Sequence, residues 1–314
     1  MSAYHVPVLV EEVCEALAPI AEAATVVDCT LGGGGHSEAI LSRLGAARVI
    51  GVDRDPAAIQ FASERLAGFG DRFCAVHAPF STLRAVLADL GIAEVAGILA
   101  DLGVSSHQLD RRERGFSFLG DAPLDMRMDP TVGPTAAEVL ETIDPRALAR
   151  LLRDFGDEPD AERIARAIVK VRPTTTADLA STVENAMSAR QRRQIGKRIH
   201  PATRTFQALR IHVNRELEEL DRFLADAPEL LTRGGRIAVI TFHSLEDRAT
   251  KRRFVRLSKA AEPPHGLPIA AVDMPKAPYR IPPGFRQGKT ASEAERSTNP
   301  RSRSARVRVL ERAA

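Results

Sequence analysis

The feature that most constrains the fold of this chain is an alternation of short apolar runs with helix-like stretches over its first hundred residues. The runs are rich in Val and Ile and lack the polar alternation of half-exposed strands, as in 25–31, 48–53, 73–78 and 97–103. Helical spacing of apolar residues fills the intervals, as in 56–66 and 81–90. This alternation predicts a doubly wound α/β sheet with parallel strands and helices on both faces.

The alternation stops after Gly103. Residues 107–134 are rich in Gly, Pro and charge, and we expect a long loop there. Helix-start signals follow it: Thr135 with Glu138, Asp144 before Pro145, and Thr175 with Asp178. We therefore predict a small all-helical domain at 109–204, inserted between two parts of the sheet domain, 1–108 and 205–314.

Sheet-like sequence returns near the end of the chain. A long helix should begin near Ala202, with one apolar face running from Phe206 to Leu224. GGRIAVITF, 234–242, predicts a fifth strand after a Gly-Gly turn, and ARVRVLER, 305–312, an antiparallel edge strand. Eight of the twenty prolines lie in 261–300, which should be mostly irregular.

Composition restricts the class of protein. With 314 residues, 44% of them hydrophobic, the chain can form one large domain or two ordinary ones. The sequence shows neither an export signal nor an apolar stretch of ~18 residues, so we expect a cytoplasmic protein that does not span a membrane. The three cysteines, Cys14, Cys29 and Cys74, form no CxxC motif, and we expect reduced thiols and no metal.

Basic residues are concentrated in two runs, although the net charge is only +3. Residues 190–210 hold seven Lys or Arg and no acid, and 248–259 hold six. Either run alone is compatible with a solvated helix face, but together they favour a phosphate-rich partner. The absence of Trp and the presence of only two Tyr argue against a broad stacking platform for single strands.

A glycine-rich turn follows the first apolar run. That run ends at Asp28, and Gly32 to Gly35 precede a helix-like stretch that starts at Ser37. Glycine permits a close approach of a ligand to the backbone. Asp53 ends the next run, nineteen residues after Gly34, where an acid can accept hydrogen bonds from both hydroxyls of a ribose. The pair predicts a nucleoside cofactor, although a glycine turn alone is often only a turn.

The turn favours S-adenosylmethionine over a dinucleotide. A GxGxxG loop would need a third glycine where this chain has Ser37 or Glu38, and a carboxylate there would repel a pyrophosphate. The usual S-adenosylmethionine loop runs from an acid into GxGxG. The chain fits it except at Thr30, which occupies the place of the first glycine.

Several longer blocks carry a resemblance to a known family: HVPVL (5–9), DCTLGGGGHS (28–37), VDRDP (52–56), DLGVSSHQLD (101–110), RGFSF (114–118), PLDMRMDP (123–130), HPATRTFQALRIHVN (200–214) and FHSLEDR (242–248). The chain resembles the ribosomal RNA small-subunit methyltransferase H family, also called MraW, over nearly its whole length. The resemblance implies a Rossmann-like class I methyltransferase sheet with a helical insertion. It also implies methyl transfer from S-adenosylmethionine to the 4-amino nitrogen of a cytidine in the decoding region of 16S ribosomal RNA, with the small ribosomal subunit as partner.

The family's cofactor contacts can be carried over by matching motif positions. The matching residues are Gly34, Gly35, His36, Asp53, Phe80, Asp101 and Gln108. In this interpretation Phe80 lies against the adenine and Asp101 faces the methyl group. Read without the resemblance, Phe80 is a core residue, His36 a bridge from loop to helix, and Gln108 a turn residue.

Asp101 is the leading candidate for catalysis. A carboxylate that accepts a hydrogen bond from the cytidine amino group would localise its lone pair as the methyl arrives. Many amino-methyltransferases carry an Asp-Pro-Pro-Tyr type motif here, whereas this chain continues Leu102, Gly103, Val104. Methylation at carbon 5 is disfavoured, because it needs a cysteine and none lies beyond Cys74.

His243, with Phe242, is a second candidate, as a wall of the cytidine pocket. The competing interpretation is that Ser244 and Asp247 form a capping box at the start of a helix. Candidate RNA contacts are Arg204, Arg210, Arg248, Lys251 and Arg252, with Phe116 and Phe118 as stacking surfaces. A methyltransferase for protein or small molecules and a noncatalytic RNA-binding factor remain open alternatives.

Overall fold

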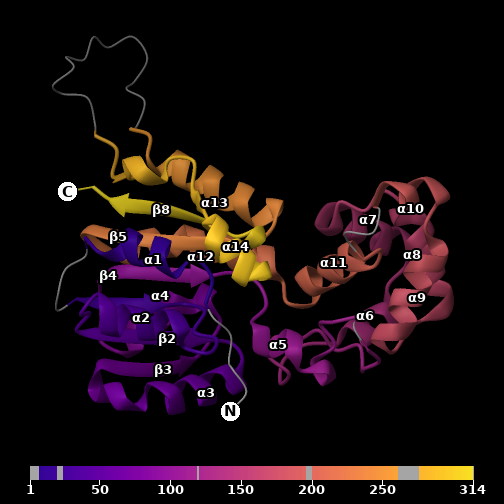
Figure 1. Ribbon diagram of the computed structural model, residues 1–314, viewed down its shortest axis with the longest axis horizontal. Coiled ribbons are helices and arrows are strands. Elements are labelled where there is room, and N and C mark those ends of the chain that lie inside the picture. Colours follow the sequence, from indigo (N-terminus) through magenta and orange to yellow (C-terminus); the bar gives the residue numbers. More distant parts are fainter. Residues whose placement is uncertain (1–6, 20–23, 119, 196–199, 261–275, 314) are drawn as a thin grey trace, which may run out of the picture. The chain divides into compact units, whose positions relative to one another are not determined.

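The computed structural model describes residues 7–19, 24–118, 120–195, 200–260 and 276–313 (Figure 1). The chain divides into two compact units. The sheet unit comprises residues 1–103 and 218–314, and the helical unit comprises residues 104–217. The sequence led us to expect the helical insertion at 109–204.

Among the described residues of the sheet unit, eight strands form one sheet, in the order β3-β2-β1-β4-β5-β8-β6 with β7 paired to β8. The first five run parallel: β1 (Thr25–Asp28), β2 (Arg48–Asp53), β3 (Phe73–His77), β4 (Val95–Asp101) and β5 (Leu231–Thr241). The other three are antiparallel to their partners: β6 (Tyr279–Arg280), β7 (Lys289–Thr290) and β8 (Arg306–Arg312). The doubly wound prediction is confirmed, and the strand order reverses between β1 and β4, where such sheets bind ligands.

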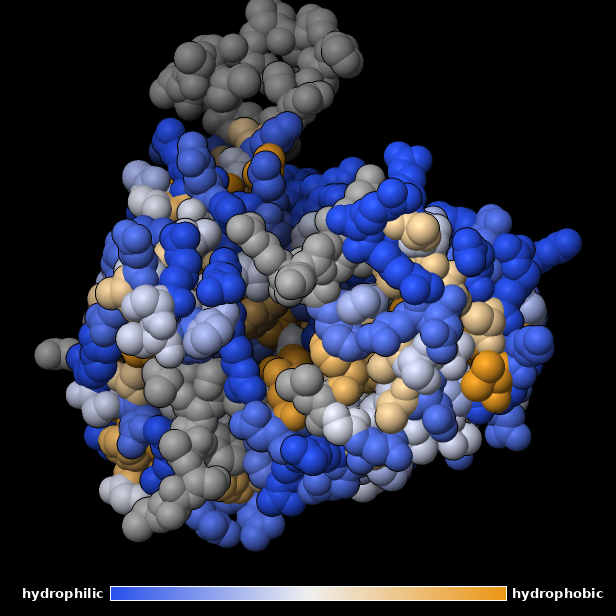
Figure 2. All heavy atoms as spheres, turned by 45° about the vertical axis from the view of Figure 1, so that its right-hand side comes forward, coloured by the Kyte–Doolittle hydropathy of each residue, from blue (hydrophilic) through white to orange (hydrophobic). Residues whose placement is uncertain are grey.

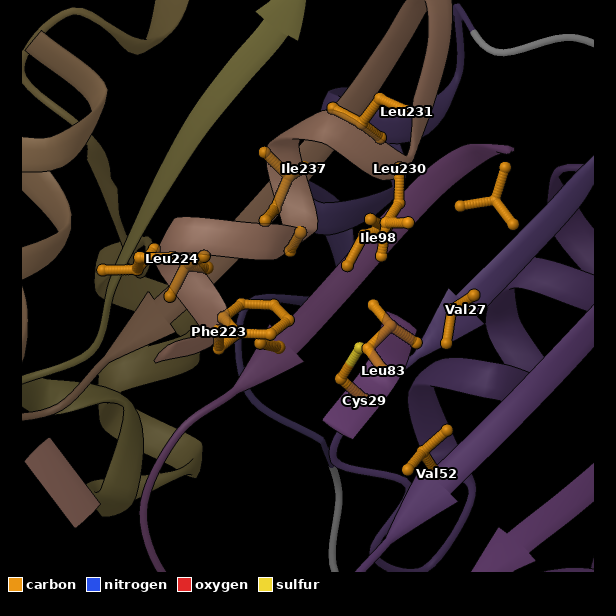
Figure 3. Close-up of a cluster of buried hydrophobic side chains, with 14 of the residues drawn as sticks. Val27, Cys29, Val52, Leu83, Ile98, Phe223, Leu224, Leu230, Leu231 and Ile237 are labelled. Atoms are coloured by element: carbon orange, nitrogen blue, oxygen red, sulfur yellow. The ribbon is translucent and has the colours of Figure 1, made fainter. Parts of the chain in front are cut away.

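Helices cover both faces of the sheet because neighbouring strand residues point in opposite directions. Val27 and Ile98 pack with α4 (Leu83–Asp89), α12 (Glu216–Asp226) and α13 (Ser244–Leu257), as Figure 3 shows for Phe223 of α12. The alternate residues Val26 and Leu99 pack with α1 (Val10–Leu17) and α2 (Gly35–Arg43). Helix α3 (Pro56–Leu66) packs on Leu31.

The long helix expected from Ala202 is broken in two. Helix α11 (Thr203–Val213) ends before Asn214, and α12 starts at Glu216 after Arg215, whose φ is +52°. The buried Asn214 side chain donates to the Met126 carbonyl at 2.7 Å and accepts from the Met128 amide at 2.7 Å. These bonds to a distant loop hold the chain in a turn that the apolar pattern did not reveal.

The predicted Gly-Gly turn before β5 is also different. Gly234 and Gly235 lie inside β5, beside a shift in its register with β4. A Cβ on Gly235 would lie 2.8 Å from the Ala96 carbonyl oxygen, so the bulge needs a glycine. Residues 276–300, which we expected to be mostly irregular, contain only short elements: β6, a 3-10 turn at Pro283–Phe285, β7 and α14 (Glu293–Thr298). Residues 261–275 lie outside the described residues.

The helical unit contains α5 (Ser106–Asp110), α6 (Ala136–Thr142), α7 (Pro145–Gly156), α8 (Ala161–Val171), α9 (Thr176–Ala186), α10 (Ala189–Ile195) and α11. The predicted caps form: Thr135 and Glu138 make a capping box, Asp144 accepts two backbone hydrogen bonds, and Thr175 accepts from the Asp178 amide. The helices share a buried apolar core that includes Leu148.

Few large apolar side chains reach the surface of the described residues: Val132, Val171 and Val255. Hydrophilic side chains dominate the face seen in Figure 2. No described helix combines the length and apolar character needed to cross a bilayer. The three cysteines are free thiols, with Cys14 and Cys29 buried and Cys74 half-buried.

Candidate active site

The glycine turn joins β1 to α2 at the point where the strand order reverses. Gly34 is the N-cap of α2 and has a φ of +76°, which an L side chain rarely adopts. A Cβ on Gly34 would lie 3.0 Å from the Leu66 side chain, and one on Gly35 would lie 2.9 Å from Pro7. These two glycines therefore meet packing demands within the protein, in addition to any demand of a ligand.

Two carboxylates, one buried and one half-buried, fix the ends of this turn. Asp28 accepts from the Ser37 hydroxyl at 2.8 Å, and Asp53 accepts from the Gly32 amide at 2.8 Å and the Asp55 amide at 2.8 Å. Burial raises the pKa of Asp28, and it raises the pKa of Asp53 to about 6 against the effect of its backbone hydrogen bonds. Each Asp53 oxygen keeps a further lone pair, which leaves room for hydroxyl donors.

Asp101 lies at the carboxyl end of β4, next to the turn. Its amide donates to the Thr30 hydroxyl at 2.5 Å, and its Oδ1 is buried without a hydrogen-bond partner. The side chain is 24% exposed, and with Oδ1 buried this exposure belongs to Oδ2 and the carbons. Burial raises the pKa of Asp101 to about 7, aided by the charges of Asp28 and Glu246 and opposed by His36.

An incompletely bonded carboxylate of this kind is costly, and it suits a ligand that brings hydrogen-bond donors or positive charge. Groups with strongly raised pKa values are concentrated at functional sites. The sheet edge around Asp101 is thus the best candidate active site of the sheet unit.

His36, on the first turn of α2, contacts both the N-terminal segment and Asp101. Its Nε2 lies 2.9 Å from the Val8 carbonyl oxygen, and its Nδ1 lies 3.8 Å from Asp101 Oδ2. The side chain is buried. It therefore bridges the turn to another segment, as one interpretation of the sequence expected, and it also faces the candidate catalytic carboxylate.

Phe80 and Phe242 contribute ring surfaces to the sheet unit. Phe80, at the start of a 3-10 turn after β3, is half-buried and meets the Phe223 ring edge-on at 5.3 Å between centroids. Phe242 follows β5 and would lie 3.6 Å from a Cβ on Gly103, so its ring borders the loop after β4. Phe80 is thus partly a core residue, with the rest of its surface open.

The predicted capping box of Ser244 with Asp247 is wrong. The N-cap of α13 is His243, and Glu246 accepts from the amides of Phe242 at 2.8 Å and His243 at 3.3 Å. Asp247 instead binds the Arg308 guanidinium through bonds of 2.7 and 2.9 Å. The His243 Nε2 lies 3.1 Å from Glu246 Oε1, so the imidazole lies next to the carboxylate that accepts from the Phe242 amide.

The candidate residues of the helical unit differ in how freely they can meet a ligand. Gln108 is buried and forms a capping box with Ser105. Arg210 makes a bidentate ion pair with Glu216, with bonds of 2.7 and 2.8 Å, and Phe116 belongs to the buried core. Phe118 stacks on His200 at 4.1 Å between ring centroids. Arg204 is partly exposed.

The exposed face of α13 is basic. Arg248, Lys251, Arg252 and Arg256 of α13 are exposed, and the exposed Lys259 follows just after the helix ends. Within the described parts of the chain, none of these five makes an ion pair within 4 Å with an acid. We call these five residues the basic face.

Sequence reasoning missed the role of Thr30. Its hydroxyl, in the place of the expected first glycine, accepts the Asp101 amide hydrogen and ties the glycine turn to β4. The departure from the glycine pattern was the available signal. Glu246 was also missed as a group that acts electrostatically on Asp101.

Comparison with known proteins agrees with the resemblance read from the sequence blocks. A model of the "MraW methylase family" matches residues 2–313. A protein of Myxococcus xanthus named "Ribosomal RNA small subunit methyltransferase H" is 50% identical over 308 residues, which cover 98% of this chain and 97% of that one. One of the same name from Nocardioides is 47% identical over 314 residues, covering 98% and 96%.

Solved structures resemble the chain only distantly. An rRNA methylase from Streptococcus thermophilus is 11% identical and covers 99% of both chains with a TM-score of 0.41, which is too low to bear on the function. The match over residues 2–313 and the identities of 47–50% are decisive. The chain belongs to the MraW methylase family, a family of methyltransferases that use S-adenosylmethionine.

Proposed function

We propose that this protein methylates the exocyclic 4-amino group of a cytidine in the decoding region of 16S ribosomal RNA, with the small ribosomal subunit as its partner. The names of its relatives support the RNA, and the sequence blocks support the nucleotide. The structural observation that carries the proposal is Asp101, a carboxylate with a raised pKa and an unpartnered oxygen beside the glycine turn.

For the cofactor, we assign the backbone of Gly34 and Gly35 and the side chains of His36, Asp53, Phe80 and Asp101, all in the sheet unit. Bound there, S-adenosylmethionine supplies a methyl group on a positively charged sulfur. The fit is supported by Asp101, whose poorly compensated negative charge favours a cation, and by the spare lone pairs of Asp53 for ribose hydroxyls. Phe80 offers its open surface to the adenine.

The acceptor nitrogen needs activation, because the lone pair of the cytosine amino group is delocalised into the ring. We assign Asp101 Oδ2 to accept a hydrogen bond from that amino group and hold it in line with the methyl group, so that positioning supplies most of the rate. Phe242 and His243 form a wall for the base. The His243 Nε2 lies 3.1 Å from Glu246 Oε1, which places the imidazole beside that carboxylate.

The burial of the cysteine thiols also favours a nitrogen over a carbon as the atom that accepts the methyl group. A carbon acceptor would need a cysteine thiolate to add to the ring. Burial raises the pKa of Cys29 well above its usual range and also raises that of Cys14. Such thiols are poor nucleophiles, and Cys74 lies inside β3.

For the RNA, we assign the basic face of α13, together with Arg204 and Phe118 of the helical unit. The cations of the basic face, which make no ion pair with an acid among the described residues, suit the phosphates of RNA. Arg210 is held by Glu216 and Phe116 is buried, so these two serve the fold of the helical unit in our proposal. A base within folded RNA must be splayed out of its stack before the reaction.

The decisive experiment incubates the protein with methyl-labelled S-adenosylmethionine and, in parallel, assembled small subunits, free 16S RNA and cytidine. We expect label in the RNA, and digestion followed by mass spectrometry should place it on the 4-amino nitrogen of one cytidine. Label on carbon 5 or on protein would contradict the proposal. Tight cofactor binding without transfer to any acceptor would favour a noncatalytic RNA-binding factor.

A further inference from the structure

The reaction proposed above leaves one chemical requirement without a residue. When the nitrogen–carbon bond forms, the sulfur–carbon bond breaks and its electron pair stays on sulfur. The amino nitrogen then carries a positive charge until it loses a proton. A base near that nitrogen must take the proton, and Asp101 is the nearest candidate.

The hydrogen bond of His36 fixes which of its nitrogens is basic. A backbone carbonyl only accepts hydrogen bonds, so the Nε2 that lies 2.9 Å from the Val8 oxygen must carry a hydrogen. In the neutral imidazole, Nδ1 then holds the lone pair. This atom faces Asp101 Oδ2 at 3.8 Å.

The ring of His36 lies among acidic groups. Asp28 and Asp101 both interact with it electrostatically, and Glu246 acts on Asp101 from α13. His36 itself lies on the first turn of α2.

We propose that Asp101 and His36 act as a proton-accepting pair, in which Asp101 takes the proton from the methylated amine and His36 Nδ1 receives it from Asp101. The inference rests on the proposed function. The proton moves from the amino nitrogen to Oδ2 and then to Nδ1, which restores the carboxylate and leaves an imidazolium. After product release, the proton passes to water.

Two observations support the assignment beyond the pairing itself. Oδ1 is buried, so the oxygen that can reach a ligand is the one that faces the imidazole. The gap of 3.8 Å is about 1 Å longer than a hydrogen bond, a difference that a small rotation of either side chain closes. With a pKa of about 7, Asp101 alone would often remain protonated after turnover, and His36 offers that proton an exit.

The first test is spectroscopic and needs no turnover. Nitrogen-15 NMR of labelled histidine reports which ring nitrogen carries the hydrogen, and the His36 signal is the one missing from His36→Gln. We expect the hydrogen on Nε2 and a change in the Nδ1 signal on Asp101→Asn. A hydrogen on Nδ1, or an Nδ1 signal that ignores Asp101→Asn, would overturn the pair.

The second test compares His36→Gln with His77→Gln. Glutamine can still donate to the Val8 carbonyl but cannot accept a proton. His77 is the matched control, because its Nε2 also lies 3.0 Å from a carbonyl oxygen, that of Arg54, on an exposed strand end. At saturating cofactor and pH 7, we expect His36→Gln to lower kcat by roughly tenfold to a hundredfold and His77→Gln to leave it unchanged.

The pH profile separates a proton-transfer role from a structural one. The kcat deficit of His36→Gln should shrink as the pH rises, because Asp101 then loses its proton directly to solvent. A deficit that is the same at every pH, or one explained entirely by weaker cofactor binding in calorimetry, would refute the pair. A wild-type protein that methylates no cytidine would instead refute the proposed function, and the NMR result would still stand by itself.

Discussion

Replacing Asp101 by Asn should make the protein more stable and less active. A carboxyl group whose pKa is raised in the folded state stabilises the fold only while it is protonated, and this contribution is lost as the pH rises through the folded pKa. For Asp101 the window runs from about pH 4, the unfolded value, to about pH 7. Asn is nearly isosteric and has no charge to bury.

The magnitude follows from the shift. From 3.8 to about 7 is roughly three pKa units, or about 4 kcal/mol as an upper bound at pH 8. At pH 5 only about one unit of the window has been crossed, which gives roughly 1–2 kcal/mol. Because the side chain is 24% exposed, solvent should reduce the shift and with it mainly the figure for pH 8, which should still be the larger of the two.

Urea unfolding of both proteins at pH 5 and pH 8 measures the effect on the sheet unit. The gain from Asp101→Asn should be clearly larger at pH 8, whereas Asp71→Asn, at an exposed position, should change little at either pH. A variant equally stable with wild type at pH 8, or one whose gain falls as the pH rises, would show that Asp101 carries no buried charge. Methyl transfer by the stabilised variant should fall steeply at saturating cofactor.

Three further predictions concern the turn, the helical unit and the basic face. Gly34→Ala should lower the free energy of unfolding by ~1–3 kcal/mol, which is more than Gly45→Ala should, because both glycines have a positive φ but only a Cβ on Gly34 would meet a neighbouring side chain. Equal losses of the two variants in denaturant unfolding would argue against the packing at Gly34. Asn214→Ala should cost the helical unit ~2–3 kcal/mol in the same assay, because two buried backbone groups lose their partner; a loss under 0.5 kcal/mol, on the same order as a surface change, would contradict that role. The variant R248Q/K251Q/R252Q, which neutralises three residues of the basic face, should bind small-subunit RNA more weakly and reduce the slope of log affinity against log salt by about 2–3. The control Arg153→Gln, at a residue paired with Glu162, should leave the slope unchanged, and an unchanged slope in the triple variant would remove the basic face from the RNA interface.

The five parallel strands were predictable because each contains a short apolar run, whereas the two-residue strands β6 and β7 carry no such pattern. The sequence placed β2 at 48–53 and α3 at 56–66, and the structure has the same bounds. It was also predictable that the acids at the ends of β1, β2 and β4 lie at one edge of the sheet, because parallel strands bring their carboxyl ends together.

What could not be predicted depends on contacts between segments far apart in the sequence. The break after Val213 is held by bonds from Asn214 to Met126 and Met128, and no periodicity within 202–226 records them. The orientation of His36 depends on the Val8 carbonyl, and the unpartnered oxygen of Asp101 on the packing around it. The cap of α13 was misplaced by one residue, since Ser244 and His243 both precede an acid by three positions.

The hydrogen bond from Gly32 to Asp53 links folding of the turn to recognition of the ribose. The same carboxylate that holds the turn in place is the one we assign to the sugar hydroxyls. A nucleoside that engages it therefore meets a loop whose shape is already set, and little ordering entropy remains to be lost on binding. The converse is that affinity and local stability cannot be varied separately at Asp53, so any exchange of cofactor specificity in this scaffold would have to begin at another residue.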